Sequence, residues 1–276
     1  MTKIDKIYRK LIKKIQKDGE LIPSRNGLTR RHFSLPTVKF CSTPLVTLRK
    51  TATMKALEEM EWFLSGNSKC PISLYDWWRN QLSPDGHYFC GYGSQLIHYP
   101  NDNCNGFNQI KALIDGLTNH PFSRRHVITT WNPADMANIT KINSNEKTPT
   151  TCHTTIAQFF ISKNGGLSMH SYQRSADMLL GVPHNWIQSW ALLLWLATQI
   201  DSYVNTMLWT FGDAHIYQEK SHLEVANIII ANKVRVYDCP PKLSYTAKAG
   251  KPFNIADFEL LGEPHDPITT IRPRLL

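Results

Sequence analysis

The sequence predicts an α+β fold that forms a single domain over residues 1–276. Segments in which apolar residues recur at helical spacing alternate with strand-like segments, and the segment 186–200 is apolar on nearly every side. Hydrophobic residues make up 42% of the chain and charged residues 19%, which is typical of a globular protein and not of a disordered one. No repeat or linker divides the chain, and it is long enough to bury a sizeable core.

The helices are predicted from apolar periodicity and from capping residues. Between Ile4 and Ile15 apolar residues recur every three or four positions, behind a Thr2–Asp5 capping pair and ahead of Gly19. Further helices are expected at residues 53–64, 107–117, 186–200 and 214–231. Because the segment 186–200 is apolar nearly all round, we expect it to be a buried central helix.

The strands are predicted from clusters of β-branched and aromatic residues between turn signals. Gly165-Gly166 separates two such segments and predicts a hairpin. The expected strands are residues 126–131, 154–162, 167–172, 207–211 and 233–237. Residues 20–36, 67–104 and 238–276 follow neither period, so we expect irregular structure there.

The net charge of +9 favours anionic partners such as nucleotides, nucleic acid or a membrane surface. Much of this charge is local to the first 17 residues, where only Asp5 opposes the cations Lys3, Lys6, Arg9, Lys10, Lys13, Lys14 and Lys17. A basic amphipathic helix can bind a membrane or nucleic acid. The simpler interpretation is a surface helix that buries its isoleucines, so the total charge is a weak guide to the site.

The cysteines, at positions 41, 70, 90, 104, 152 and 239, form no CxxC pair and match no zinc spacing, so we expect no metal site. The charged N-terminus is followed by no apolar run of the kind that a secretory leader has. The longest apolar stretch, residues 190–197, is far shorter than the roughly 20 residues of a membrane span. We therefore expect a soluble cytoplasmic protein with reduced thiols.

Polar residues gather around two of the expected strands. A lone buried cysteine is usually a small hydrophobe, but Cys152 has Thr151 and His153 as neighbours, which suits a pocket. A reactive thiolate needs a nearby cation, and Arg174 can supply it if the two strands pair. The stretch SYQRSADMLLGVPHNW, residues 171–186, surrounds an apolar centre with Gln173, Arg174, Ser175, Asp177 and Asn185.

Two further groups could bind a ligand. Adjacent arginines such as Arg124 and Arg125 usually form a solvated face, but two guanidinium groups can also clamp a phosphate. His215 and Tyr217 stand where a strand is expected to give way to a helix, which is a common place for ligand contacts. Each of these signals is weak alone.

Taken together and in order, these motifs resemble the thymidylate synthase family. The matching segments are 123–125, 152–153, 172–177, 181–185 and 211–217, with Glu59 ahead of Trp62-Phe63-Leu64, and the resemblance runs from about Arg25 to Glu259. It implies a thymidylate synthase-like fold, in which helices surround a large mixed sheet and the sheet mediates a homodimer. It also implies dUMP as the substrate and 5,10-methylenetetrahydrofolate as the co-substrate.

The resemblance further implies roles for individual residues. The dUMP-binding set is Arg25, Arg124, Arg125, Gln173, Arg174, Ser175, Asn185, His215 and Tyr217. Within this set Arg25, Arg174 and Ser175 would bind the phosphate, and Arg124 and Arg125 would reach in from the second subunit. The folate-binding set is Tyr75, Trp78, Asp177, Leu180, Gly181 and His184. The catalytic set is Cys152, Glu59, Tyr92, Asn185 and Arg174.

The chemistry implied is nucleophilic catalysis on uracil. The Cys152 thiolate would add to carbon 6, so that carbon 5 can take the one-carbon unit, and Glu59 would relay the proton that carbon 5 loses. An asparagine amide both donates and accepts, so Asn185 suits the NH and carbonyl of uracil. Relatives that act on cytosine carry aspartate there, and Asn185 therefore favours dUMP over dCMP.

The folate half departs from the family pattern. Tyr75 stands in place of a tryptophan, His184 in place of a phenylalanine, and one residue is inserted between Asn185 and Trp190. Glu59-Met60-Glu61-Trp62 resembles phage pyrimidine hydroxymethylases, and the tail, residues 272–276, does not end in valine. A folate site with smaller side chains would admit water, which could add to the methylene on carbon 5. His184, with a pKa near 7, would activate that water. The alternative interpretations are that His184 only packs at the start of a helix and that Tyr75 is a tolerated replacement of one aromatic residue by another.

These departures predict a dUMP hydroxymethylase that makes 5-hydroxymethyl-dUMP, in the host cytoplasm if the source is a phage. The alternative is a thymidylate synthase that makes dTMP and dihydrofolate. A remote alternative is a non-catalytic nucleic-acid-binding homologue, suggested by the basic N-terminal helix, although the sequence contains no recognised nucleic-acid-binding motif.

Overall fold

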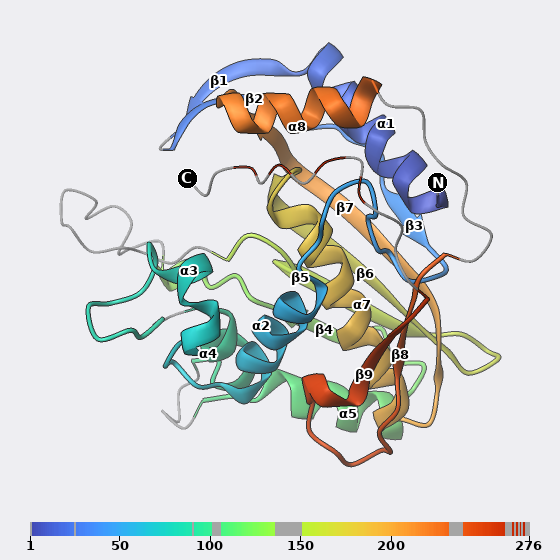
Figure 1. Ribbon diagram of the computed structural model, residues 1–276. Coiled ribbons are helices and arrows are strands. Elements are labelled where there is room, and N and C mark those ends of the chain that lie inside the picture. The colour runs from blue at the N-terminus through green and yellow to red at the C-terminus, as the bar shows by residue number, and fades with distance from the viewer. Residues whose placement is uncertain are drawn as a thin grey trace.

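One mixed sheet organises the protein (Figure 1). The computed structural model describes residues 2–24, 26–89, 91–100, 106–135, 151–231 and 240–262, together with 267, 269, 271 and 273. Within this part the sheet has seven strands, in the order β1-β2-β7-β6-β5-β4, and β3 also pairs with β7. The strands are β1 (Glu20–Ser24), β2 (Gly27–His32), β3 (Val38–Phe40), β4 (Val127–Thr129), β5 (Ile156–Ile161), β6 (Gly166–Asp177) and β7 (Tyr203–Tyr217). The predicted α+β class is confirmed.

The central strands β6 and β7 are parallel and are joined by helix α7 (Gly181–Gln199). All other pairs in this sheet are antiparallel. Helix α7 covers one face of β6 and β7, and α2 (Thr53–Ser65) packs on the outer side of α7. Asn185 is thereby held at the start of a buried helix, beside the ends of the two longest strands.

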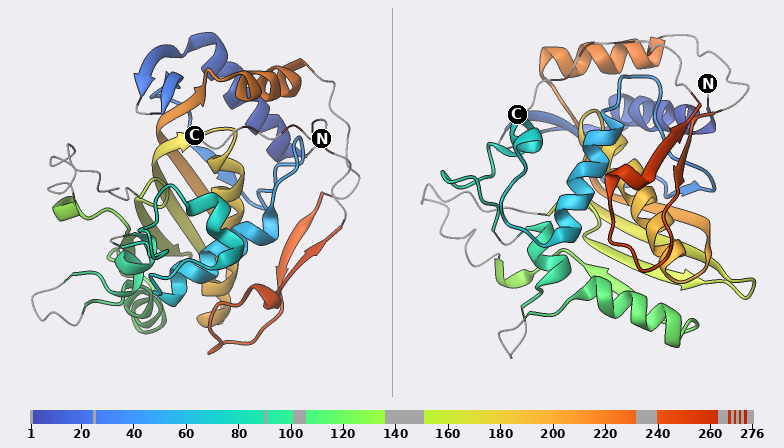
Figure 2. Two further views of the ribbon diagram at one scale, coloured as in Figure 1. Left: turned by 60° about the vertical axis from the view of Figure 1, so that its left-hand side comes forward. Right: turned by 60° about the horizontal axis from the view of Figure 1, so that its bottom comes forward.

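The remaining helices surround this centre (Figure 2). The α-helices are α1 (Lys3–Asp18), α3 (Tyr75–Trp78), α4 (Tyr92–Ile97), α5 (Gln109–Asn119) and α8 (Lys220–Ala231), and the short 3-10 helices are η1 (Ile72–Leu74), η2 (Pro133–Asp135) and η3 (Ile255–Asp257). Helices α1 and α8 contact each other near the β1–β2 hairpin. Among the described residues, no helix combines the length and the apolar composition that crossing a membrane requires.

The N-terminal helix agrees with its prediction in detail. Thr2 and Asp5 form the capping box, and Asp5 is fully buried, where it also accepts from the Thr47 amide and hydroxyl at 2.8 Å. The Tyr8 hydroxyl donates to the Met178 carbonyl at 2.6 Å. The apolar face of α1 is therefore tied to the loop that joins β6 to α7, and its lysines are left on the outer face.

Three predictions of secondary structure were wrong. Residues 20–36 contain the β1–β2 hairpin, because β2 pairs with residues 214–217 of β7, a contact that the basic local sequence does not reveal. For the same reason β7 continues to Tyr217, and α8 begins only at Lys220 instead of at 214. The tail contains β8 (Lys242–Tyr245) and β9 (Phe258–Leu261), which pair with each other, while the predicted strand 233–237 lies outside the described residues.

Smaller differences concern element ends. Helix α7 begins at Gly181, five residues before the predicted start, because residues 181–185 continue the helix despite their mixed polarity. The segment 67–104, expected to be irregular, contains η1, α3 and α4. Strands β4, β5 and β6 lie within or overlap the predicted segments, and Gly165 takes the left-handed conformation at their hairpin, with φ 84°.

Within the described part of the chain, no helix covers the face of the sheet opposite α7, and this face is called the open face below. On β5 the side chains alternate strictly, with Ile156 49% and Phe160 63% exposed and Phe159 buried. Val127 on β4 is 40% exposed, and His170 on β6 is exposed beside them in register. This open face of the sheet thus exposes three large apolar side chains, those of Val127, Ile156 and Phe160.

Candidate active site

Cys152 lies in the turn that leads into β5, beside the guanidinium of Arg174 on β6. Arg174 Nη2 is 3.8 Å from Cys152 Sγ, and the same guanidinium donates to the Thr151 carbonyl at 3.2 and 3.3 Å. The guanidinium carbon lies 5.0 Å from the centre of the Trp131 ring. A fixed positive charge at this distance favours a thiolate over a thiol. The cation that the sequence suggested for Cys152 is thus brought next to it.

The backbone around Cys152 is held by hydrogen bonds with Tyr92 and Ser175. The Tyr92 hydroxyl, on α4, accepts from the Cys152 amide at 2.6 Å and from the His153 amide at 3.2 Å. The Cys152 carbonyl accepts from the Ser175 amide at 3.3 Å. Thr154 has φ 48°, a left-handed conformation that is uncommon for a β-branched residue. These contacts hold in place the backbone from which the Cys152 side chain extends.

Neighbouring His153 does not supply a second positive charge. Its ring stacks on Tyr92, with centroids 4.5 Å apart and planes at 23°, and is buried. Burial lowers the pKa of His153 to about 3, so the ring is neutral at physiological pH. Burial also raises the pKa of Tyr92 well above its ordinary value, so its hydroxyl keeps its proton.

Asn185 belongs to a buried series of amides. Its Oδ1 accepts from Gln173 Nε2 at 3.0 Å, and its Nδ2 donates to Gln188 Oε1 at 3.3 Å. Gln173 Oε1 in turn accepts from the Trp209 indole at 2.9 Å. Gln173 precedes Arg174 on β6, so the same strand carries this series on the α7 face and the Cys152–Arg174 pair on the opposite face.

Glu59 ends that series in the core. It is 7% exposed, and its two carboxylate oxygens accept from Gln188 Nε2 and, at 2.5 Å, from the Trp78 indole. Burial raises the pKa of Glu59 to about 7, against the lowering effects of the two hydrogen bonds and of the Lys55 charge. Its carboxyl group can therefore change protonation near neutral pH, which suits a proton-relay group.

A second polar group forms where β6 and β7 end. Asp177 pairs in register with His215, and Asp177 Oδ1 accepts from the Leu179 and Leu180 amides at 2.9 Å each. Burial lowers the pKa of His215, but its hydrogen bond to Asp213 and the charges of Asp177 and Asp213 outweigh burial, so the net shift is upward. This end of the sheet presents ionisable groups that can hydrogen-bond a sugar hydroxyl or a polar ring.

Two glycines allow the close approach of these elements. A Cβ at Gly212 would lie 2.5 Å from the Tyr172 hydroxyl and 2.6 Å from the Arg174 carbonyl. A Cβ at Gly181 would lie 3.2 Å from Asn185 Oδ1. Strand β7 therefore passes Arg174 at a distance that a larger residue at position 212 would not permit, whereas a side chain at position 181 would make a tight contact with Asn185.

His184 corrects one prediction. Its Nδ1 bonds the Leu180 carbonyl at 2.7 Å and its Nε2 accepts from the Ala52 amide at 3.2 Å, so both ring nitrogens are engaged. Its ring lies 4.9 Å from that of Trp77. Enclosure of the ring and the Arg49 charge lower its pKa to about 4, not the expected value near 7. The geometry is that of a packing histidine.

The remaining predicted residues are placed as follows. Tyr75, on α3, is 40% exposed, whereas Trp78 is 7% exposed and packs against Trp62 and Tyr88. Leu180 and Gly181 form the start of α7, and Tyr217 lies 5.3 Å from His215, ring centre to ring centre. Arg124 and Arg125 are exposed ahead of β4. Arg25 lies outside the described residues.

Sequence reasoning missed Gln188 and Trp77. Gln188 lies in the segment 186–189, which is one residue longer than the family pattern, and that change in spacing was the signal that could have drawn attention to it. Trp77 follows Asp76 in the segment where the folate wall was expected, and Lys55 Nζ lies 5.2 Å from its ring centre.

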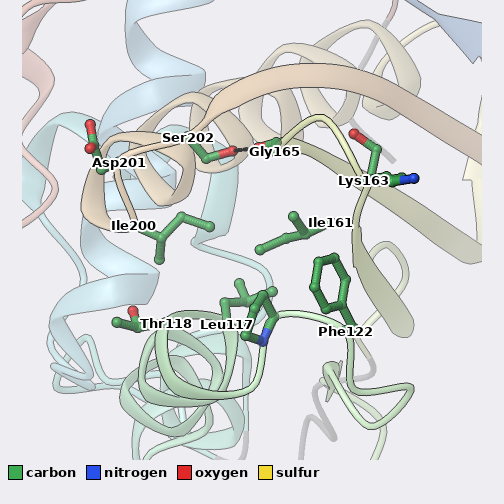
Figure 3. Close-up of a pocket in the computed structure, with 11 residues that line it drawn as sticks. Leu117, Thr118, Phe122, Ile161, Lys163, Gly165, Ile200, Asp201 and Ser202 are labelled. Atoms are coloured by element: carbon green, nitrogen blue, oxygen red, sulfur yellow. Dashed lines mark hydrogen bonds between the residues drawn. The ribbon is translucent and has the colours of Figure 1, made fainter.

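A separate pocket of about 300 Å³ lies at the other end of α7 (Figure 3). It is bounded by Leu117, Phe122, Ile161, Ile200 and Ser202, among others. From the rise per residue of an α-helix, Ile200 lies about 22 Å along the axis from Asn185. Its lining holds none of the predicted catalytic residues, so this pocket is not the candidate site.

Comparisons with known proteins agree with the motifs. The family model described as thymidylate synthase matches residues 6–272. A thymidylate synthase from Corynebacterium aurimucosum is 29% identical over 283 aligned residues, which cover 99% of this chain and 98% of the relative. One from Brachyspira hyodysenteriae is 30% identical over 237, covering 82% of this chain and 84% of the relative.

The fold, the site and these matches define a folate-dependent one-carbon transferase. The chain belongs to the thymidylate synthase family, whose reaction transfers a one-carbon unit from methylenetetrahydrofolate to dUMP.

Proposed function

We propose that the protein is a thymidylate synthase, which makes dTMP and dihydrofolate from dUMP and methylenetetrahydrofolate. Relatives that carry this name align over most or nearly all of the chain. The observation that carries the proposal is the position of the Cys152 sulfur next to the Arg174 guanidinium, on the strand whose preceding residue, Gln173, belongs to the buried Asn185 network. The hydroxymethylase prediction relied on His184 to activate water, but both ring nitrogens of His184 are hydrogen-bonded to backbone groups, of Leu180 and Ala52.

In the proposed mechanism Cys152 acts as the nucleophile. Its thiolate, stabilised by Arg174, forms a bond to carbon 6 of uracil, and the electron pair of the ring double bond moves toward carbon 5 and oxygen 4. Asn185 donates to the oxygen on which charge accumulates. Carbon 5 bonds the one-carbon unit and then loses its proton to Glu59, and the released electron pair breaks the bond between the one-carbon unit and the folate nitrogen, which leaves an exocyclic methylene on carbon 5. Addition of a hydride to this methylene forms the methyl group, restores the double bond between carbons 5 and 6 and expels the sulfur of Cys152. Bound methylenetetrahydrofolate supplies the one-carbon unit and the hydride.

The described residues fit a folate with its acidic tail. Arg49 is 6% exposed, and its Nε and Nη1 have no hydrogen-bond partner within the described part of the chain. A buried guanidinium with unused donors suits a carboxylate. In this proposal Arg49 joins the predicted folate-binding set and binds a carboxylate of the folate tail. Asp177, from the same set, would contact the pterin ring.

The phosphate-binding set of the proposal combines two subunits. Arg174 and Ser175 come from β6, Arg124 and Arg125 come from the partner, and Arg25 lies outside the described residues, between β1 and β2 in the sequence. By strand alternation, Arg174 shares the open face of the sheet with His170. A second copy seated on that face would therefore bring its own arginines close to Arg174.

The first prediction concerns the assembly. We expect a homodimer with twice the 31.6 kDa chain mass, formed through the open face of the sheet. Phe160→Asp, which places a charge at the centre of that face, should give monomers, whereas Ile72→Asp, at a 91% exposed position outside the sheet, should not. Light scattering after gel filtration measures both. A wild-type protein of single-chain mass at micromolar concentration would contradict the dimer.

The second prediction concerns the product. Wild-type protein incubated with dUMP and methylenetetrahydrofolate should form dihydrofolate and dTMP in equal amounts, because a site without an activated water leaves hydride transfer as the route to completion. Absorbance follows dihydrofolate, and mass spectrometry identifies the nucleotide. Nucleotide product without dihydrofolate would contradict the proposal.

One observation keeps the hydroxymethylase as a second candidate. Tyr75 is 40% exposed at the position where the family has a tryptophan, and a smaller ring leaves space for water beside the folate. The mass of the product separates the two, since 5-hydroxymethyl-dUMP exceeds dTMP by one oxygen atom. If wild type makes the hydroxymethyl product, Tyr75→Trp should raise the dTMP fraction.

The third prediction concerns base selection. Asn185→Asp should lower kcat/KM for dUMP by about 100-fold or more and raise relative activity toward dCMP, because a carboxylate cannot donate to the uracil carbonyl. Steady-state rates with both nucleotides measure the change, with Asn205→Asp, an exposed position on β7, as the control. Unchanged selectivity would remove Asn185 from base recognition.

A further inference from the structure

Gln188 is a fully buried side chain of α7 that joins two predicted catalytic residues. Its Nε2 donates to Glu59 Oε2, and its Oε1 accepts from Asn185 Nδ2 at 3.3 Å. Its exposed fraction is 0%, so solvent cannot take over either contact. Both polar atoms of this amide are thereby committed to the candidate site.

The amide orientations in this network follow from its two ends. The Trp209 indole can only donate, so Gln173 presents Oε1 to it and Nε2 to Asn185. Asn185 then presents Oδ1 to Gln173 and Nδ2 to Gln188. An ionised Glu59 can only accept, which requires Nε2 of Gln188 on its side. Every hydrogen bond therefore points toward Glu59, and no single amide can flip without placing two donors or two acceptors in contact.

We propose that Gln188 is a positioning residue for the one-carbon transfer, which fixes the Glu59 carboxylate and the Asn185 amide in one hydrogen-bonded unit. This inference rests on the proposed function, because it assumes that Glu59 relays the proton and that Asn185 recognises the base, and Gln188 holds both of them. With Gln188 in place, Asn185 keeps a second Nδ2 hydrogen and a second Oδ1 lone pair for uracil. Without it, the Asn185 amide loses the contact that selects its rotamer.

The same contact acts on the ionisation of Glu59. Burial raises the pKa of Glu59 to about 7, and the hydrogen bonds from Trp78 and Gln188 and the Lys55 charge act against that rise. Without the Gln188 donor, one of the interactions that lower the pKa of Glu59 is lost, so burial raises that pKa further. Glu59 then becomes ionised only at higher pH.

Two other groups near Glu59, Tyr92 and Cys70, do not titrate in the same range. Tyr92 faces it from α4 and Cys70 from the segment ahead of η1, and Lys55 lies one turn earlier on α2. Burial raises the pKa of Cys70 to about 11 and that of Tyr92 well above its usual value. Helices α3 and α7 contribute Trp78 and Gln188, which are not titratable. Among the described contacts, the hydrogen bonds of Gln188 go to Asn185 and Glu59, and of these two only Glu59 titrates, so a shift of the acid limb that follows from replacing Gln188 reports Glu59.

The test replaces Gln188 by methionine, which keeps the length and helix preference of the side chain but removes the donor and the acceptor. The acid limb of the kcat profile for dUMP should move up by about one pH unit, as for the loss of one charge-assisted hydrogen bond. The dUMP-to-dCMP ratio of kcat/KM should fall by roughly tenfold. Gln188→Glu, of nearly equal volume, adds a second carboxyl group and should move the limb further in the same direction.

The matched control is Gln109→Met. Gln109 is another buried glutamine, which donates to the Gln95 and Thr129 carbonyls at 2.6 and 2.7 Å and has no described contact with Glu59. It should lower thermal stability without moving the acid limb. Melting curves for all variants show which of them are folded.

A readout without turnover completes the test. Infrared spectra of protein labelled with ¹³C-carboxyl glutamate, with Glu59→Gln subtracted to assign the band, give the titration of Glu59 directly. Its midpoint should rise in folded Gln188→Met or Gln188→Glu. An unchanged midpoint would overturn the role of Gln188 even if dUMP turnover is normal, whereas a shifted midpoint in a protein inactive on dUMP would overturn the proposed function alone.

Discussion

Cys152→Ser is expected to lower kcat for dUMP on the order of 10⁴-fold or more, because removal of a catalytic nucleophile leaves only the contribution of binding. A serine hydroxyl does not ionise near neutral pH, and the Arg174 charge 3.8 Å from the sulfur cannot overcome that difference. The affinity for dUMP should change by no more than about threefold, because the contacts that bind dUMP in the ground state do not depend on the bond that the sulfur forms in the transition state. Rapid-quench kinetics and calorimetric titration measure the two quantities.

Cys41→Ser is the control for this substitution. Cys41 is an exposed thiol whose sulfur lies 3.9 Å from the Thr206 hydroxyl, on a different part of the sheet. It should leave kcat and dUMP affinity unchanged. If Cys152→Ser instead loses dUMP affinity and thermal stability together, Cys152 is a structural residue and the mechanism fails.

Glu59→Gln is expected to lower kcat by about 10²- to 10⁴-fold, the usual contribution of a general acid–base group. The pKa of Glu59 is raised to about 7, so in wild type the ionised form and the rate should increase as pH rises through neutrality. The variant should lack this limb of the profile, because an amide does not titrate. Release of tritium from carbon 5 of labelled dUMP measures the step.

A neighbouring carboxylate provides the comparison. Glu58 precedes Glu59 on α2 but contacts the Ser73 hydroxyl at the surface instead of the amide network. Glu58→Gln should therefore keep the acid limb and most of the rate. Retention of the wild-type profile in Glu59→Gln would assign the proton relay to another group.

Local sequence predicted those parts of the fold that short-range forces decide. The capping box at Thr2 and Asp5 and the apolar stripe of α1 need only neighbours three or four positions away. The buried character of α7 follows from its composition. By contrast, the β1–β2 hairpin and the end of β7 stabilise each other through Thr29–Tyr217 and neighbouring pairs, which are nearly two hundred residues apart in the chain.

The candidate site divides in a similar way. The motif around residues 172–185 pointed to Arg174, Asp177 and Asn185, and the structure places them at the ends of β6 and at the start of α7. The expected pKa of His184 was wrong, because burial and the partners of the two ring nitrogens are tertiary properties. Gln188 was missed, because a one-residue insertion does not show which side chain of the lengthened segment is buried or which partners it has.

The sequence by itself determined the family, the chemical type of each residue in the site and the helical segments with strong local signals, because these depend on side-chain identity and short-range spacing. The tertiary structure alone decided which groups share a hydrogen bond, which are removed from water and in what direction each amide points. Distance and burial set those properties, and they arise only when β6, β7, α2 and α7 pack together.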